Sequence, residues 1–485
     1  MSLFRKILEF FGFEQTLGAV ITRWRIKRKI PITPEPITPP VQDKPIEYVI
    51  NDPSTPSLVK SVMPPVYDNN PAIIVKGYKG GGFERRSIEG QAANCFVTVV
   101  NTIKMVNERS EIHLPKWAGT STLNVIPRAG SDLNAYYDRR NLKFFYVSEN
   151  KFEFFTADSS DIVAHELGHA IMDTYRPDTW SVMSLEVASI HEAFADFIAM
   201  MHILNYDEAI DFIVSQTEGD LRKNNVMSKL AEDFGELIFK KTGSEGGRYV
   251  DALRHAINDF KYISPSSLPK EAPNNQLAAE CHSFGRIFLG ALYDMIVLVY
   301  EDKKMSGLSP SDSLKQARDI VLRYVLKSLQ NAPLNTRFYE SMAKTILWAD
   351  VILGNRKYHD QIRQIFFNRN ILSAELSCLS FPKCENKEKI MKVQGSLNIK
   401  LSEVLLKSQS ISNPLYNVEI EIPTEEVYLY DLDNNFYDKS CATYEECLNA
   451  AVEMVDHLHN TNSVSDNPDS LFSVIDGKLV RNYFS

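Results

Sequence analysis

Residues 159–173 constrain the fold of this chain most, because they place two histidines four residues apart in an apolar run, SSDIVAHELGHAIMD. Positions i and i+4 of an α-helix lie on the same face, so His165 and His169 can offer two imidazoles to one ion. Glu166 projects about a hundred degrees around the helix from His165, within reach of a water at that ion but badly placed as a third ligand. The pattern predicts a buried metal-binding helix with a separate base. The simpler alternative is a helix whose histidines make ordinary hydrogen bonds.

A second stretch, SIHEAFADFIAMM, supplies the remaining ligand. Glu192 and Asp196 are again four residues apart, within a run of Ala, Phe, Ile and Met. Burying two carboxylates on the apolar side of a helix costs free energy unless a cation or hydrogen-bond donors compensate. We therefore expect Glu192 to be the third ligand and Asp196 to accept the second ring N–H of a ligand histidine. The alternative is an amphipathic helix with both acids in solvent. His191 is expected to point to a different face and to be structural.

With these two segments, the chain resembles the thermolysin-like zinc metallopeptidases of the gluzincin group. VAHELGHA followed by EAFAD matches the two zinc-binding helices of that family, and three further segments follow the family's order from about residue 66 to 374. NAYYD resembles its edge strand, which implies that Asn134 and Ala135 hold an extended substrate. YVDALRHAI and ECHSFGRIFLGALYD offer Arg254 for contact with a substrate carbonyl and His282 for stabilising the oxyanion. A structural alternative stays open for each: a turn asparagine, a salt-bridge arginine and a helix-start histidine.

The sequence departs from the family pattern in two places. Twenty-two residues separate His169 from Glu192, a few more than is usual, and the loop YRPDTWSVM stands where the family has an oxyanion-assisting tyrosine. Tyr175 and Trp180 are both candidates for that neighbourhood. The resemblance also raises Ca²⁺ as a second ion, with Asp161 at a calcium-ligand position, but the acidic cluster expected after Glu192 is missing.

Patterning along the chain, together with this resemblance, predicts an α+β fold: a two-lobed metallopeptidase with a mixed N-lobe, a mainly helical C-lobe and a small α+β accessory region. A buried helix is expected over residues 91–106 and strands in STLNVIPRAG and LKFFYV. Almost continuous helix is expected from residue 184 to 374, followed by strands and the helix TYEECLNAAVEMVDHLH. Four parts are predicted. Residues 1–65 are a basic segment with a proline-rich linker, and residues 66–170 are the N-lobe, which ends in the HELGH helix. Residues 171–377 are the C-lobe, and residues 378–485 are the accessory region.

The resemblance implies a zinc-dependent endopeptidase, a hydrolase that cuts extended polypeptides. Zn²⁺ held by His165, His169 and Glu192 would activate a water, with Glu166 as general base and His282 at the oxyanion. One alternative is a zinc aminopeptidase of the same group, which needs an acidic anchor for a free amino terminus. Another is a catalytically silent, metal-stabilised binding protein. Because the family's long propeptide is missing, a further hypothesis is that the accessory region or the N-terminal segment covers the cleft.

The resemblance implies a peptide or protein substrate as the partner. The formal net charge of -9 gives no attraction to phosphate, and no nucleic-acid motif is present, so no nucleic-acid partner is expected. The N-terminal segment is interrupted by charges too often for a signal peptide, which favours a cytoplasmic location or signal-independent export. A membrane-surface helix and a helix packed on the protein both fit that segment. Thiols, disulfides and a metal site stay open for the two C-x5-C pairs, Cys378 with Cys384 and Cys441 with Cys447.

Overall fold

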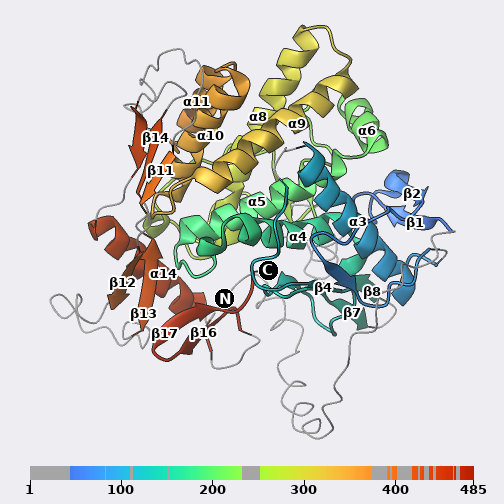
Figure 1. Ribbon diagram of the computed structural model, residues 1–485, viewed down its shortest axis with the longest axis horizontal. Coiled ribbons are helices and arrows are strands. Elements are labelled where there is room, and N and C mark those ends of the chain that lie inside the picture. The colour runs from blue at the N-terminus through green and yellow to red at the C-terminus, as the bar shows by residue number, and fades with distance from the viewer. Residues whose placement is uncertain are drawn as a thin grey trace, which may run out of the picture.

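Long apolar helices form the centre of the structure, with small sheets on either side (Figure 1). The fold is mixed α+β, as predicted. The computed structural model describes residues 44–81, 83–109, 113–149, 152–231, 252–373, 390–393, 396–400, 418–423, 426–430, 436–440, 444–461, 464–465 and 470–484. The basic N-terminal segment lies outside these ranges, so the choice between a membrane-surface helix and a helix packed on the protein is untested.

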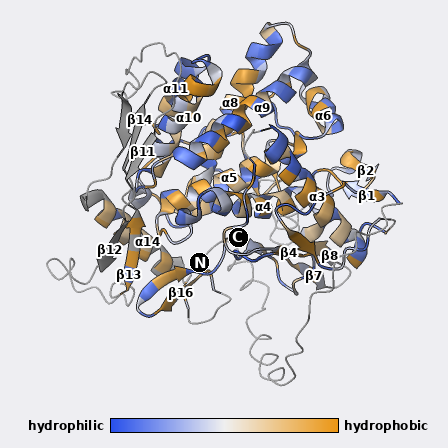
Figure 2. Cartoon of the chain, in the orientation of Figure 1, coloured by the Kyte–Doolittle hydropathy of each residue, from blue (hydrophilic) through white to orange (hydrophobic). Residues whose placement is uncertain are grey.

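The central helices pack in a chain of neighbours. α4 (Ser160–Tyr175) lies on α5 (Leu185–Ile203), α5 lies on α8 (Cys281–Met305), and α8 lies on α9 (Pro310–Asn331). All of α5 is buried, as expected for a helix that is apolar around its whole circumference. Figure 2 shows apolar residues along α5 and polar stretches on α9. α8 is long and apolar enough to cross a membrane, yet 83% of its apolar window is buried within the protein, as in a core helix.

Four further helices surround the central ones, and most of them lie where the sequence predicts helix. The remaining helices of this part are α3 (Ile88–Arg109), α6 (Asp207–Thr217), α10 (Phe338–Gly354) and α11 (His359–Asn368). The predicted buried helix over residues 91–106 is confirmed within α3. The prediction of almost continuous helix after residue 184 is wrong for residues 252–280, which contain only a two-residue strand and a single 3-10 turn. Pro265, Pro269 and Pro273 explain this, because proline lacks the amide donor that a helix interior needs.

The N-terminal sheet has the strand order β3-β4-β6-β5. Its strands are β3 (Ile73–Val75), β4 (Leu123–Ile126), β6 (Asn141–Phe144) and β5 (Ala135–Tyr137). β3, β4 and β6 run parallel, while β5 pairs antiparallel with β6 and forms one edge. β7 (Tyr146–Glu149) and β8 (Phe152–Phe155) add a hairpin. The strands predicted in STLNVIPRAG and LKFFYV are confirmed, and β5 lies against the helix α4.

The predicted proline-rich linker is too long, because residues 46–62 belong to the packed body. β1 (Ile46–Val49) and β2 (Val59–Val62) form an antiparallel hairpin. The buried Tyr48 hydroxyl lies 2.7 Å from His202 Nε2. The Asn51 carbonyl accepts hydrogen bonds from the amides of Ser160 and Asp161, two of the donors that the first turn of α4 leaves without helical partners. A segment that reads as extended linker therefore caps the helix that carries the histidine pair.

The C-terminal region has the predicted α+β composition. One sheet has the order β12-β13-β17-β16 and the other β11-β14-β15. The first sheet contains β12 (Ser396–Lys400), β13 (Glu419–Pro423), β17 (Lys478–Arg481) and β16 (Phe472–Ile475). The second contains β11 (Ile390–Val393), β14 (Glu426–Tyr430) and β15 (Phe436–Ser440), and α14 (Tyr444–Thr461) packs on β13. Cys378, Cys384 and Cys441 lie outside the described residues, so the state of the C-x5-C pairs remains a prediction.

Two glycines set the distances between the central helices. A Cβ added at Gly168 of α4 would lie 2.7 Å from the Cα of Ala195 in α5. A Cβ added at Gly285 of α8 would lie 2.8 Å from the carbonyl oxygen of Ser189, also in α5. Both contacts are with backbone atoms, which side-chain rotation cannot relieve. The three helices can therefore approach this closely only with glycine at these positions.

We expect Gly168→Ala to destabilise the protein, although alanine favours a helix interior by about 1 kcal/mol. The overlap with Ala195 should cost about 1–3 kcal/mol in the free energy of unfolding, measured by urea denaturation. Gly290→Ala is the matched control, because its added Cβ meets the end of the Arg369 side chain instead of backbone. Equal effects of the two substitutions would contradict a special role for Gly168.

Glu186, near the start of α5, is a buried acid outside the histidine cluster. It accepts hydrogen bonds from the Tyr262 hydroxyl at 2.6 Å and the Tyr339 amide at 2.9 Å. Burial raises the pKa of Glu186 to about 7, although these two hydrogen bonds lower it in part. The folded protein therefore holds this proton more tightly than the unfolded chain does.

Stability should fall as pH rises through this pKa. Since the folded pKa of Glu186 lies above its ordinary value of 4.5, its contribution is fully present below about pH 4.5 and is lost as pH rises past about 7. The loss should be on the order of 3 kcal/mol. Glu186→Gln keeps an acceptor for Tyr339 and should remove this part of the pH dependence, measured as the free energy of unfolding between pH 4.5 and 8. Parallel wild-type and variant profiles would refute the assignment.

Candidate metal centre

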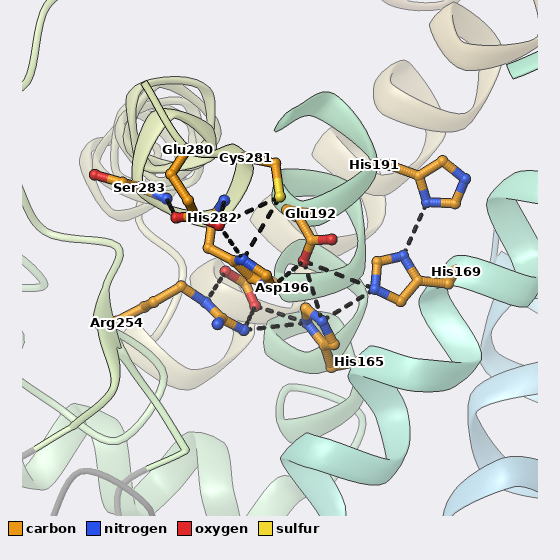
Figure 3. A network of polar contacts seen from close by, with 10 residues as sticks. All are labelled: His165, His169, His191, Glu192, Asp196, Arg254, Glu280, Cys281, His282 and Ser283. Carbon is orange, nitrogen blue, oxygen red and sulfur yellow. Dashed lines mark hydrogen bonds and ion pairs between the residues drawn. The ribbon is translucent and has the colours of Figure 1, made fainter. Parts of the chain in front are cut away.

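Three buried side chains from α4 and α5 converge on one point (Figure 3). His165 and His169 come from successive turns of α4, and Glu192 comes from the facing side of α5. Their ligand atoms lie within 4.8 Å of one another. The two histidine Nε2 atoms are 3.2 Å apart and lie 3.5 and 3.7 Å from Glu192 Oε2. The structure thus brings together the three residues that the sequence predicts as ligands.

The chemistry of this cluster fits a bound cation. Glu192 Oε2 is buried and has no hydrogen-bond partner among the described residues, and the same is true of Glu166 Oε2. A buried carboxylate oxygen without a donor is costly, and a cation between it and two imidazole nitrogens would compensate that cost. Two imidazoles and a carboxylate are a donor set that proteins use for divalent metals. These residues can therefore hold a metal ion.

Asp196 and Arg254 orient His165 from the side of the ring opposite its Nε2 atom. Asp196 Oδ1 lies 2.7 Å from His165 Nδ1, which leaves Nε2 of that ring facing the other ligands. Arg254, in β10 (Arg254–His255), binds Asp196 through Nε at 2.8 Å and Nη2 at 2.7 Å. Burial alone would raise the pKa of Asp196, but the charges of Arg254 and His165 outweigh it and hold that pKa well below its usual range. Asp196 therefore stays ionised and fixes the tautomer and orientation of His165.

His191 does the same for His169, which the sequence analysis did not foresee. His191 was expected to point to a different face and to be structural; its Nδ1 lies 2.8 Å from His169 Nδ1, whereas Glu192 approaches the opposite ring nitrogen, Nε2. Burial lowers the pKa of both rings well below the ordinary value, so both are neutral. If His169 Nε2 is the ligand atom, its Nδ1 carries the proton and donates it to His191 Nδ1. The available signal was the position of His191 directly before the ligand Glu192.

Removal of the His191 acceptor should weaken metal binding. His191→Leu leaves the Nδ1–H of His169 without its acceptor, and loss of such partners costs about tenfold to a hundredfold in metal affinity. His191→Asn, which keeps a side-chain oxygen acceptor, should lose less. Competition with a chromophoric chelator measures the metal dissociation constant of each variant. If the Leu and Asn variants bind metal equally, the contact between the two rings does not support the site.

Glu166 lies beside the cluster and outside the ligand set. It follows His165 on α4, and its side chain is 3% exposed. Burial raises the pKa of Glu166 to about 8, with the neighbouring Glu192 charge adding to the rise and His165 opposing it. A carboxyl with a pKa near neutrality can both accept and donate a proton, which is what general acid–base chemistry requires. This is the position and chemistry that the sequence predicts for a base.

His282, at the start of α8, completes the cluster. Its Nε2 lies 3.2 Å from Glu192 Oε2, and its Nδ1 lies 2.6 Å from Glu280 Oε1. Glu280, which the sequence analysis missed, is the N-cap of α8 and accepts from the amides of His282 and Ser283. The sequence pattern that could have predicted this contact is a glutamate two residues before a histidine at the start of a helix. Cys281 contributes a second possible ligand group with Glu192 and His282.

The remaining predicted residues lie on nearby elements. Ala135 is the first residue of the edge strand β5, and the Asn134 carbonyl accepts from the Phe145 amide. Trp180 packs edge-on to Tyr137 of that strand, with ring centroids 5.8 Å apart. Tyr175 packs against the main hydrophobic core. No contact described in the structure assigns either aromatic residue to an oxyanion.

Asp161, considered as a calcium ligand, has hydrogen-bond donors within the fold. Its carboxylate accepts from the Ile162 amide at 2.7 Å and from the Ala231 amide at 2.7 Å. These contacts tie the start of α4 to the segment after α6. They give Asp161 a structural role at the beginning of the helix.

Comparison of the chain with protein-family models found no match, and comparison with curated proteins found none.

Proposed function

We propose that this chain is a zinc-dependent endopeptidase with the two-lobed arrangement of the thermolysin-like metallopeptidases. The N-lobe would contain the β3-β4-β6-β5 sheet, the C-lobe would contain α5 and the helices after it, and the α4–α5 pair would lie between them. One observation carries the proposal: His165, His169 and Glu192 converge, and beside them Glu166 is buried with its Oε2 lacking a hydrogen-bond partner among the described residues. A purely structural metal site has no need of such a group.

Zinc is the metal we propose, because two imidazoles with one carboxylate leave a fourth tetrahedral position for water. When bound there, zinc would lower the pKa of that water and polarise the substrate carbonyl. Glu166 would accept a proton from the water as its oxygen attacks the carbonyl carbon. Glu166 would then deliver that proton to the leaving amine as the C–N bond breaks. The acid and the amine are the two products.

His282 would stabilise the negative charge that develops on the carbonyl oxygen. Burial lowers its pKa, but the charges of Glu192, Cys281 and Glu280 outweigh that effect and raise the pKa well above the ordinary value. A protonated imidazole is a charged donor for an oxyanion. Glu280 would orient this ring through Nδ1. Because Arg254 is already engaged by Asp196, we propose that it acts mainly by positioning His165.

An extended peptide would bind along β5. Edge strands present backbone N–H and C=O groups that can pair with a further strand, and such pairing leaves both ends of a peptide free. Asn134 and Ala135 begin this edge, which lies against α4. This geometry favours an endopeptidase over an aminopeptidase, which must anchor a free amino terminus.

Replacement of Glu166 tests the mechanism. Glu166→Gln should keep about one zinc per chain while its cleavage rate on an unstructured peptide library falls by about 10²–10⁴-fold, because the base is lost and the ligands remain. Zinc content by atomic absorption and product masses by mass spectrometry are the measurements. Glu208→Gln, at an exposed position of α6, is the matched control and should cleave as the wild type does.

The cleavage products discriminate the alternatives. Internal cuts support the endopeptidase, whereas stepwise loss of amino-terminal residues would show an aminopeptidase. Zinc in both proteins with no cleavage by either would favour the metal-stabilised binding protein.

A further inference from the structure

The edge of β5 is paired with a segment from the far end of the chain. After β17 ends at Arg481, the Asn482 amide still donates to the Leu471 carbonyl, and residues 483–484 then leave the accessory sheet and reach the centre of the molecule below α4 and α5 (Figure 1). The Tyr137 amide donates to the Phe484 carbonyl at 2.9 Å, and the Phe484 amide donates to the Tyr137 carbonyl at 3.0 Å. The pairing is antiparallel. Within residues 481–484, here called the 481–484 segment, Phe484 therefore occupies the backbone groups of Tyr137 that an edge-bound peptide would use.

The Phe484 side chain fills an aromatic pocket beside the metal ligands. It is 2% exposed and stacks on His191 with ring centroids 3.7 Å apart. It also stacks on His169 at 5.3 Å and meets Trp180 edge-on at 5.3 Å. The next side chain, Tyr483, stacks on Tyr136 of β5 at 4.5 Å. The segment therefore binds in the way that extended peptides bind to an edge strand. Its backbone pairs with β5, and one of its side chains fills a pocket.

Burial of Arg481 adds an unfavourable contribution to this attachment beside its favourable ring contacts. Its guanidinium lies over Phe472 at 4.6 Å and over Phe484 at 4.1 Å. Its Nε and Nη2 atoms are buried and have no hydrogen-bond partner among the described residues. Burying charged N–H groups without acceptors costs free energy, so part of the gain from stacking is lost. An attachment weakened in this way favours exchange with another ligand.

We propose that the 481–484 segment is a self-blocking strand at the peptide-binding edge of β5, and that extended peptides with an aromatic side chain opposite Tyr137 compete with it. Competition is required by the geometry, because the amide and carbonyl of Tyr137 are each used by Phe484 and the pocket holds one ring. The inference rests on the proposed function in taking β5 as the substrate edge. It adds a substrate preference and a cis-acting inhibitor.

Peptide binding in a full-length chain that does not cleave tests the inference. The probe is a fluorescein-labelled peptide of sequence LVRNYFS, which repeats residues 479–485, and the parent protein is Glu166→Gln. Adding Phe484→Ala should lower the dissociation constant of the peptide at least about tenfold, measured by fluorescence anisotropy. The reason is that a tethered competitor acts at an effective concentration in the millimolar range, and the substitution removes its main contact.

Two controls isolate the effect. Ile475→Ala, at an exposed position of the same β16–β17 hairpin, should leave peptide affinity at the parent value. The peptide LVRNYAS should bind no better to the Phe484→Ala protein than to the parent. Equal affinity of LVRNYFS for parent and variant would overturn the proposal, as would equal gains with both peptides.

Amide hydrogen exchange distinguishes release of the segment from a general folding defect. In a folded Phe484→Ala protein, the Tyr137 amide should exchange faster while the amides of α4 and α5 stay protected. If that variant unfolds, Phe484→Leu retains apolar volume and should show the same faster exchange at Tyr137 with a smaller gain in peptide affinity. Unchanged protection of Tyr137 in the folded variant would contradict the blocking strand.

Failure of the blocking strand and failure of the peptidase give different results. If the variant gains peptide affinity but zinc-loaded Phe484→Ala, with Glu166 intact, cleaves nothing, the strand inference stands and the peptidase proposal fails. If the zinc-loaded wild type cleaves peptides as fast as zinc-loaded Phe484→Ala and the anisotropy shows no gain, the peptidase proposal stands and the strand inference fails.

Discussion

The close approach of three helices is the constraint on which the candidate site depends. Gly168 allows α4 to touch the backbone of α5 at Ala195, and Gly285 allows α8 to touch α5 at Ser189. At these separations, one residue of α5, Glu192, lies within 3.5 Å of His165 on one side and 3.2 Å of His282 on the other. A side chain added at either glycine would push the helices apart by more than a metal site tolerates, since ligand distances vary by only about 0.2 Å.

Many polar side chains are buried between these helices. Their burial is tolerated because the side chains are joined to one another by hydrogen bonds and ion pairs. Asp196 lies between His165 and Arg254, and each contact offsets the cost of removing its partners from water. Among the described residues, Glu192 Oε2, Glu166 Oε2 and His191 Nε2 are buried at this cluster without a hydrogen-bond partner, although imidazole nitrogens lie 3.2–3.7 Å from Glu192 Oε2. A cation and a substrate water would supply the missing interactions of the two carboxylate oxygens.

Helical spacing was enough to predict which residues of α4 and α5 meet, because i and i+4 fix one face of a helix whatever packs against it. His165, His169, Glu192 and Asp196 follow from that rule. His191 did not, because its contact depends on how far α5 is rotated about its axis against α4, which Gly168 and Ala195 determine in three dimensions. The hairpin at residues 46–62 was missed for a related reason: prolines exclude helix locally, but its burial comes from the distant His202 and Ser160.

The position of the 481–484 segment could not be predicted from local sequence patterns, because its partner strand lies more than three hundred residues earlier in the chain. Its position links the accessory region to the candidate metal site through one residue. His191 Nδ1 accepts a hydrogen bond from His169 Nδ1–H, and the face of the His191 ring stacks on Phe484. If the segment is displaced as proposed, the face of the His191 ring that Phe484 covers becomes free, while the contact of His191 Nδ1 with His169 lies in the ring plane and does not depend on that stacking. Exchange of the segment for a peptide can therefore proceed without loss of the contact that orients His169.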